Sequence, residues 1–361
     1  MRYSVIMISI RKIAQQLNLS PSTVSKAIRG QVGEVSLDTA KRILAHCHQS
    51  GYLSKTETSQ IIAKMTVQES KQQIFIVSCR KGIEFFYNET LTGICETIQN
   101  NRLYPSLYIG TNQDFLDQFP FERASSIIIL GRTDPDFVHL FTSHKIPTIL
   151  VDNRISNSTS FAVNSDNLEG VFSSVETLIK LGHRRIAFFC MHESQAEPTY
   201  TFLQRQSGYI AGITQFGLAY DPSLVVIGYG EGNILSQYRV NECIQTLRRL
   251  AKRVLEIDPL PTAVISANDL AAYALRGVLS EHGIRVPEDI SIVGYDGMHL
   301  LENRPPGFAP ISTRVVKWRE MGQSAAEMAI EIAASSELRS KYITIPTVYE
   351  DAGTVAKPRK D

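Results

Sequence analysis

From residue 74 onward, short runs of apolar residues alternate with longer segments in which apolar residues recur at helical spacing. This alternation predicts parallel strands joined by helices that cover the faces of a sheet. Because the apolar runs are almost unbroken, we expect sheets that are buried on both faces. The predicted strands are 74–79, 106–110, 126–130, 148–152, 185–190, 224–228, 263–267 and 291–296, and the clearest helices are 89–101, 168–181 and 270–282.

The first 53 residues lack this alternation and predict three short helices instead. Apolar residues recur at helical spacing over 10–17, and Asn18 suits the turn that follows because it tolerates a left-handed backbone. Ser20 is a good N-cap and Pro21 a good first residue for a second helix. A third helix is predicted over 36–50. The expected fold class is therefore an all-α helix-turn-helix head followed by an α/β body.

The outer face of the second predicted helix carries short hydrogen-bonding side chains and cations. These residues are Ser22, Thr23, Ser25, Lys26 and Arg29. No acidic side chain on this helix would repel phosphate, so the helix is suited to a major groove, where it can contact base edges. A plain helical hairpin without a DNA contact is the alternative.

Charge is distributed unevenly along the chain. Residues 1–55 hold eight basic and two acidic side chains, whereas all 361 residues together carry a net charge of only +1. A basic head on an acidic body indicates a polyanionic partner for the head. The chain is 43% hydrophobic and 20% charged, which is typical of a soluble protein with two or three units. No apolar run is long enough to cross a bilayer, so no membrane partner is expected.

The chain shows no sign of export or of a disulfide framework. Residues 1–10 are mildly apolar but lack a charged lead and a small-residue cleavage site, and Met7 is an alternative start. The five cysteines are odd in number, and none forms a C-x-x-C pair. This usage fits a reducing compartment, so we expect a cytoplasmic protein.

Polar side chains follow several of the predicted strands, where an open α/β sheet places its ligands. The candidate ligand-binding residues are Asp152, Arg154, Arg205, Asn268, Asp269 and Asp296. Each has a structural alternative, because a carboxylate can cap a helix or a turn and Arg205 can pair with a surface carboxylate. Their joint occurrence at successive strand ends favours a ligand site.

Motifs of catalysis are missing from the sequence. There is no G-x-x-x-x-G-K-[ST] phosphate loop, no H-E-x-x-H zinc site and no G-x-S-x-G nucleophile elbow. We expect neither catalysis, a metal nor a cofactor. An α/β enzyme that acts on a sugar and carries a fused helical head is the alternative that turnover assays would support.

The head resembles a known family. The stretches LSPSTVSKAIRG and VSLDTAKRILAHCHQSGY are similar to the DNA-binding head of the lactose/galactose repressor family. This resemblance implies that Pro21, Ser22 and Lys26 occupy the base-reading positions, next to the N-cap Ser20. It also makes Thr23, Ser25 and Arg29 candidates for contacts to phosphate or to the groove edge.

The connector 54–73 is polar apart from a few apolar residues, so a free linker is one interpretation. In the family that the head resembles, this region contains a hinge helix that orders on DNA and inserts an apolar side chain into the minor groove. Ile61 or Met65 would then be the wedge. The match is imperfect, because Leu53, Ser54 and Lys55 follow Gly51-Tyr52, and the register of the helix stays open.

The body resembles the effector-binding part of the same family. The stretches IPTILVDNR, LIKLGHRRIAFF, RQSGYIAGI and LPTAVISANDLAAYALRGVLSEHGIRVPEDISIVGYD carry the resemblance. It implies a two-lobed, periplasmic-binding-protein-like (type I) fold with parallel sheets. By position, Arg205 matches the arginine that grips the effector, Asp296 an acidic motif residue, and Asn268 with Asp269 an A-N-D motif. Phe85 and Phe86 match an aromatic pair that covers a ligand, while Gly297 departs from the family's second aspartate.

We expect three regions along the chain, with the body divided into two lobes. The head is 1–53, the hinge or linker is 54–73, and the effector-binding and dimerisation domain is 74–361. Within this domain, one lobe comprises 74–182 and 312–336, and the other comprises 183–306 and 341–361. The chain is expected to cross between the lobes near 182–184, 306–312 and 336–341.

These observations predict a transcription regulator, specifically a repressor. We expect a homodimer that binds double-stranded operator DNA with an affinity controlled by a small-molecule effector. The resemblance implies a sugar or sugar derivative, and nucleobases stay open as effectors. A stand-alone sugar-binding receptor without a DNA role is the alternative function.

Overall fold

The chain folds into two compact units, which we call the head and the body. In the computed structural model, the head comprises Met1–Gln73 with Pro120–Ser125, and the body comprises Ile74–Phe119 with Ser126–Asp361. The structure describes residues 9–31, 34–70, 73–78, 87–101, 103–109, 117–131, 135–155, 161–192, 199–229, 240–302, 304, 307–334 and 340–359.

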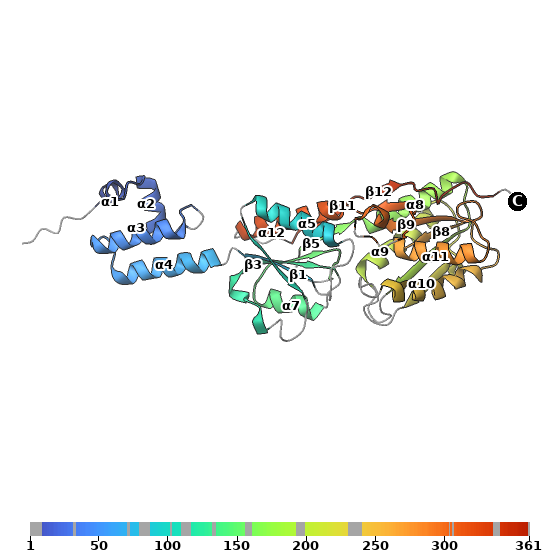
Figure 1. Ribbon diagram of the computed structural model, residues 1–361, viewed down its shortest axis with the longest axis horizontal. Helices are drawn as coiled ribbons and strands as arrows, with labels where there is room; N and C mark the ends of the chain where they lie inside the picture. Colours follow the sequence, from blue (N-terminus) through green and yellow to red (C-terminus); the bar gives the residue numbers. More distant parts are fainter. Residues whose placement is uncertain are drawn as a thin grey trace, which may run out of the picture. The chain divides into compact units, whose positions relative to one another are not determined.

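The head begins with three short helices, as the sequence predicts (Figure 1). They are α1 (Ile10–Leu17), α2 (Pro21–Ile28) and α3 (Leu37–Gln49). Asn18 ends α1 in the left-handed conformation at a φ of 56°. A serine side chain caps each helix by accepting a hydrogen bond from a backbone N–H of the first turn. Local signals alone therefore define the limits of these helices.

The connector is a fourth helix, α4 (Lys55–Ser70), and not a free linker. A capping box starts it: the Ser54 hydroxyl accepts from the Glu57 N–H at 3.1 Å, and the Ser54 N–H donates to Glu57 Oε2 at 2.8 Å. The Ser-x-x-Glu spacing at 54–57 was the sequence signal for this start. Met65 of α4 is buried in the apolar core that Ile13, Val24 and Leu44 help to form.

The first lobe of the body is built on a six-stranded sheet with the order β11-β5-β4-β3-β1-β2. The paired strands β1/β2, β3/β4, β4/β5 and β5/β11 are parallel. Helices α5 and α12 lie on one face of the sheet and α7 on the other (Figure 1). The elements are β1 (Gln73–Ser78), α5 (Tyr87–Asn100), β2 (Pro105–Ile109), β3 (Ala124–Leu130), α7 (Pro135–Ser143), β4 (Thr148–Val151), β5 (Phe161–Ser165), α12 (Trp318–Ala334) and β11 (Tyr342–Ile345).

The second lobe is built on a similar sheet with the order β12-β10-β9-β8-β6-β7. Its paired strands are parallel except for the short β12, which is antiparallel to β10. Helix α8 packs against α9, and α10 packs against α11. The elements are α8 (Asn167–Leu181), β6 (Ile186–His192), α9 (Tyr200–Gln215), β7 (Val225–Tyr229), α10 (Val240–Leu255), β8 (Ala263–Ser266), α11 (Asp269–Glu281), β9 (Ser291–Asp296), β10 (Thr313–Val315) and β12 (Val348–Glu350).

The chain crosses between the lobes at other positions than the sequence analysis expected. The crossings lie between β5 and α8, between β10 and α12, and between β11 and β12. The expected crossings near 182–184, 306–312 and 336–341 are therefore wrong. Gly182 only ends α8, in the left-handed conformation at a φ of 108°. Strand and helix patterns alternate in the same way whichever sheet a helix covers, so they do not reveal to which lobe α8 or α12 belongs.

Two glycines let α5 and α12 touch through their backbones. A Cβ atom at Gly93 would collide with the Arg319 carbonyl oxygen, and one at Gly322 would collide with the Thr90 carbonyl oxygen. No side-chain rotation relieves such a collision, because each obstacle belongs to a backbone. The two helices therefore approach as closely as they do only because both positions lack a side chain.

We expect Gly322→Ala to lower the free energy of unfolding of the body by about 1–3 kcal/mol, because the helices must separate. Urea unfolding followed by the fluorescence of Trp318, the one tryptophan of the chain, measures this loss. Gly277→Ala is the matched control, since its Cβ would meet only the flexible end of Arg248, at 2.6 Å. Equal midpoints for the two variants would contradict the close-approach argument.

Candidate functional site

The exposed start of α2 carries the residues expected to read DNA. The Ser20 hydroxyl accepts from the Thr23 N–H at 3.0 Å and lies 2.8 Å from the Thr23 hydroxyl, so both side chains help to start the helix. Pro21 and Ser22 are exposed. The side chains at the first turn are therefore held in place before any ligand arrives.

The two cations of α2 have partners within the head. Lys26 forms an ion pair with Glu34, which the sequence analysis did not foresee. Arg29 donates from Nη2 to the Ser25 hydroxyl at 2.8 Å. The Lys26 and Glu34 side chains are 35% and 52% exposed, and an ion pair this exposed contributes little to stability. A phosphate or a base edge can therefore displace Glu34 at low cost.

The two candidate wedge residues do not face solvent in this state. The Met65 side chain is 1% exposed within the core of the head, and Ile61 is half-buried against the same core. The expectation that one of them is presented for insertion into a groove therefore does not describe this state. The sequence could not reveal this, because an apolar residue of a helix serves a core as well as a groove.

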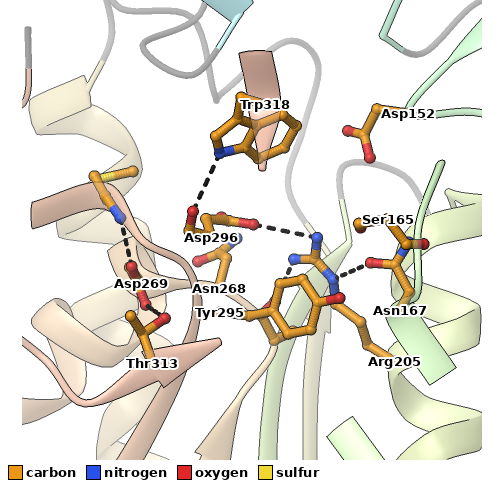
Figure 2. Close-up of polar contacts among 12 residues, drawn as sticks. Asp152, Ser165, Asn167, Arg205, Asn268, Asp269, Tyr295, Asp296, Thr313 and Trp318 are labelled. Carbon is orange, nitrogen blue, oxygen red and sulfur yellow. Dashed lines mark hydrogen bonds and ion pairs between the residues drawn. The ribbon is translucent and has the colours of Figure 1, made fainter. Parts of the chain in front are cut away.

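In the body, Arg205 of α9 is the centre of a buried polar cluster (Figure 2). Its Nε donates to Asn167 Oδ1 at 2.7 Å, its Nη1 to the Ala267 carbonyl at 2.6 Å, and its Nη2 lies 3.2 Å from Asp296 Oδ1. The guanidinium also lies over the ring of Tyr295, at 3.8 Å from its centroid. Arg205 is 3% exposed, so the alternative interpretation, in which it pairs with a carboxylate on the surface, is wrong.

Asp296 closes β9 and is the ionic partner of Arg205. Burial raises the pKa of Asp296 to about 8, and the neighbouring Arg205 acts in the opposite direction. Its backbone has a φ of 116°, and its carbonyl accepts from the indole N–H of Trp318 at 3.1 Å. Trp318 begins α12, so this bond joins the end of a strand in one lobe to the start of a helix in the other.

Asn268 and Asp269 have different tasks at the start of α11. Asn268 caps the helix by accepting from the Ala271 N–H at 2.8 Å. The carboxylate of Asp269 instead accepts from the Thr313 hydroxyl at 2.6 Å and from the Met298 N–H at 2.7 Å. Asp269 is fully buried, so the interpretation of this residue as a simple helix cap is wrong. It fastens β10 and the segment after β9 to α11.

Asp152 faces the Arg205 cluster from the first lobe (Figure 2). It follows β4 in a left-handed conformation at a φ of 59°, and the hydroxyl of Tyr87 donates to its Oδ2 at 3.1 Å. Its negative charge contributes to raising the pKa of Arg205, after the larger effects of burial, which lowers it, and of Asp296. The two lobes therefore place acids on both sides of one buried guanidinium.

A cleft of about 560 Å³ borders this cluster. Its wall includes Asp296, Val316, Trp318, Leu300 and Glu302. Volumes of this order suit a small organic ligand, and a wall that is partly apolar with a few polar groups is typical of such sites. We call this space the central cleft. Of the predicted ligand-binding residues, only Asp296 lines it.

Arg154 lies in a different, smaller space. The guanidinium is 4.4 Å from the ring centroid of Tyr342, and the pocket beside it, of about 100 Å³, shares no wall residue with the central cleft. Phe85 and Phe86, which were also expected to contact a ligand, lie outside the described residues.

Several residues of the cluster were not predicted from the sequence. Asn167, Tyr295, Thr313 and Trp318 hold Arg205, Asp269 or Asp296 in place. They come from four separate segments, and nothing in the local pattern marks them as neighbours. Asp166 caps α8 by accepting from the Glu169 N–H at 3.1 Å.

Two structural features are missing from the described part of the chain. None of its helices is long and apolar enough to cross a bilayer. None of its histidine, cysteine, aspartate and glutamate side chains gather into a group that could hold a metal ion.

The chain is similar to known proteins over almost its whole length. Residues 175–350 match the model of the periplasmic binding protein-like domain. A probable HTH-type transcriptional repressor, ExuR of Bacillus subtilis (strain 168), is 26% identical over 344 residues, which are 93% of this chain and 95% of that protein. The HTH-type transcriptional repressor PurR of Vibrio atlanticus (strain LGP32) is 26% identical over 90% of this chain and 92% of its own length.

Solved structures show the same fold. The transcriptional regulator CelR in complex with cellobiose superposes with a TM-score of 0.65 at 21% identity, covering 96% of this chain and 99% of that one. A LacI family transcriptional regulator from Enterococcus faecium with bound ribose has a TM-score of 0.63 at 20% identity, covering 80% of this chain and all of that one. The named relatives are transcriptional regulators and not enzymes.

Proposed function

This chain is a homologue of HTH-type transcriptional repressors with the fold of LacI-family regulators, and on that premise we propose that it is a sequence-specific repressor whose operator affinity a small molecule controls. The observation that carries the proposal is the extent of the similarity. It covers 93% of this chain and 95% of one repressor, so it includes both the head and the body. A stand-alone receptor would need only the body.

The head would bind double-stranded DNA through α2. Pro21, Ser22 and Lys26 would face base edges, while Thr23, Ser25 and Arg29 would contact phosphates or the groove edge. The exposed first turn and the easily displaced partner of Lys26 support this assignment. In the DNA-bound state, Met65 or Ile61 would leave the core of the head and enter the minor groove.

A homodimer would present two heads to a palindromic site. Strand β2 lies at the edge of the first sheet and exposes Leu107 and Ile109, and the exposed Tyr104 directly precedes it. Exposed apolar side chains on a sheet edge favour a protein contact. We propose this edge as part of the dimer interface, and we place the dimer in the cytoplasm.

The effector would bind between the lobes, beside Arg205 and Asp296. Two of the similar structures hold cellobiose and ribose, which supports a sugar or sugar derivative here. A ligand controls DNA affinity only if its own affinity differs between the DNA-competent and the incompetent state. Contacts from both lobes provide that difference, because they form fully in only one lobe arrangement. We propose no catalytic role for this ligand.

The proposal is tested by selecting DNA from a random-sequence library on the purified full-length protein. We expect enrichment of a two-fold symmetric sequence. Fluorescence anisotropy with that DNA, repeated in the presence of small molecules that raise the melting temperature, then measures the effector response. A protein that binds all sequences alike at physiological salt, or whose affinity no stabilising ligand changes, would overturn the proposal.

Lys26→Ala is expected to weaken binding of the selected operator by roughly tenfold or more, with a smaller effect on unrelated DNA, because a base contact is lost. Lys180→Ala is the matched control, since Lys180 lies on α8 of the body and pairs with Glu176. Anisotropy titrations at one salt concentration compare the variants. An unchanged operator affinity in Lys26→Ala would reject the groove-facing assignment.

A further inference from the structure

A second pocket, which we call the Arg154 pocket, lies where the chain first crosses between the lobes. Its volume is about 100 Å³, which is enough for a few non-hydrogen atoms but not for a whole sugar. Both lobes contribute to its wall. The lining residues include Arg154, Asn164 and Tyr342 of the first lobe and Asn167, Tyr200 and Gln204 of the second.

Arg154 supplies the cation of this pocket. Hydrogen bonding to the Tyr200 hydroxyl is the main reason why the pKa of Arg154 is raised, and the Tyr342 ring lies under the guanidinium at 4.4 Å. The two tyrosines thus hold a guanidinium that is still exposed. Among the described residues, no carboxylate lies within ion-pair distance of it. Arg205 differs, because each of its three nitrogens already has a partner.

The remaining wall favours a single negative charge. Helix α9 begins at Tyr200, and its N-cap Thr199 makes no side-chain capping bond, so the helix terminus keeps its partial positive charge. The one acidic residue of the wall, Asp166, is committed to capping α8. The pocket therefore offers one cation, Arg154, without a carboxylate partner among the described residues, and one acid, Asp166, that already caps a helix. This charge balance fits a monoanion better than a doubly charged phosphate. The planar guanidinium also matches the geometry of a carboxylate.

The wall also holds an acceptor with no donor. Asn164 is 7% exposed, its Nδ2 donates to the Asn153 carbonyl at 3.1 Å, and its Oδ1 has no hydrogen-bond partner among the described residues. A buried acceptor without a partner is costly. Asn164 lines the Arg154 pocket, so this oxygen is the unused acceptor that the wall offers to a ligand hydroxyl. An acid that also carries a hydroxyl therefore meets both unused groups.

We propose that the Arg154 pocket binds the carboxylate end of a small hydroxycarboxylate. Arg154 holds the carboxylate from the first lobe, and Gln204 and Asn167 contact the same ligand from the second. Asn167 also accepts from Arg205, which pairs with Asp296 at the wall of the central cleft. An occupant of the pocket is thus two side-chain contacts away from that cleft. A regulatory effect of this ligand rests on the proposed function, but its binding does not.

The experiment uses the full-length protein and ligand-observed NMR or calorimetry, with sodium lactate and sodium glycerate as probes at constant ionic strength. Lactamide and glycerol are the matched neutral molecules, and inorganic phosphate is the competing anion. We expect both hydroxycarboxylates to bind and the neutral molecules not to bind. Arg154→Gln should weaken the binding roughly tenfold or more, because a charged hydrogen bond is lost. Arg249→Gln, an exposed arginine on α10, should leave it unchanged.

The proposal fails if lactate and glycerate do not bind, if Arg154→Gln binds them as the wild type does, or if phosphate binds as tightly as they do. These outcomes are separate from a failure of the repressor function. A protein that binds its operator and responds to a neutral sugar, but ignores both carboxylates, overturns the pocket alone. A protein that binds lactate through Arg154 but has no preferred DNA sequence overturns the repressor function alone.

Discussion

Arg205→Ala is expected to abolish the effector response and to lower the free energy of unfolding of the body by about 3–5 kcal/mol. The loss is large because Asp296 stays buried after its ionic partner is removed. The Asn167 amide oxygen and the Ala267 carbonyl lose their donor at the same time. Urea unfolding followed by Trp318 fluorescence measures the stability, and Trp318 is well placed because its indole N–H donates to the Asp296 carbonyl.

Operator binding by the head should survive in Arg205→Ala, because every contact of Arg205 named above lies within the body. Arg249→Ala on the surface of α10 is the matched control, and both of its properties should stay close to those of the wild type. A variant at position 205 that keeps the ligand response would remove Arg205 from the effector site. If Arg205→Ala unfolds at the same urea midpoint as the wild type, the buried ion pair contributes little to the net stability.

Asp269→Asn is the second substitution with a large expected effect, a loss of about 2–4 kcal/mol in the stability of the body at a pH above the raised pKa of about 7, where Asp269 is ionised. Both carboxylate oxygens of Asp269 accept hydrogen bonds, from the Thr313 hydroxyl and from the Met298 N–H. An asparagine offers only one acceptor oxygen and turns an NH2 group toward the other donor. The measurement is again urea unfolding, compared with the exposed-site variant Asp38→Asn in the head.

The same variant tests the pH dependence of stability. Burial raises the pKa of Asp269 to about 7, so between the ordinary carboxyl pKa of 3.8 and this value the folded body holds a proton that the unfolded chain releases. The contribution of Asp269 to stability is therefore greatest below pH 3.8 and declines as the pH rises toward 7. Burial raises the pKa of Asp296 as well, so its contribution has the same sign. Asp269→Asn should flatten the decline without removing it, and a slope equal to that of the wild type would contradict the raised pKa.

The helices of the head could be predicted from the sequence because their signals are local. Asn18, Ser20 and Pro21 lie where the chain turns or starts a helix, and each acts on its own neighbours. The capping box at Ser54 and Glu57 is equally local, because its Ser-x-x-Glu spacing marks the start of α4. The resemblance to the lactose/galactose repressor family is confirmed by the comparisons.

The body was predictable as an architecture but not in its connections. The missed strands β5, β10, β11 and β12 have at most five residues, and several carry polar side chains along one face. A short, half-polar strand has no pattern that separates it from a loop. The crossings were misplaced for the same reason, since they follow these strands.

The candidate site was predictable by residue type but not by partnership. Arg205 and Asp296 were named from their positions after strands, and the structure joins them. Asn167 lies 38 residues before its partner Arg205, and Trp318 lies 22 residues after its partner Asp296. Only folding brings these residues into the cluster. Arg154 lies apart from the cluster because it follows β4 on the side toward β11, where Tyr342 lies under it.

The three crossings have a mechanical consequence. Between the elements that they connect lie only Asp166, then Val316 and Lys317, then Pro346 and Thr347. Three connections this short restrict sliding and separation of the lobes, so rotation about the crossings is the movement that they permit most easily. A ligand that binds between the lobes would therefore act on this body mainly by changing the angle between the two lobes.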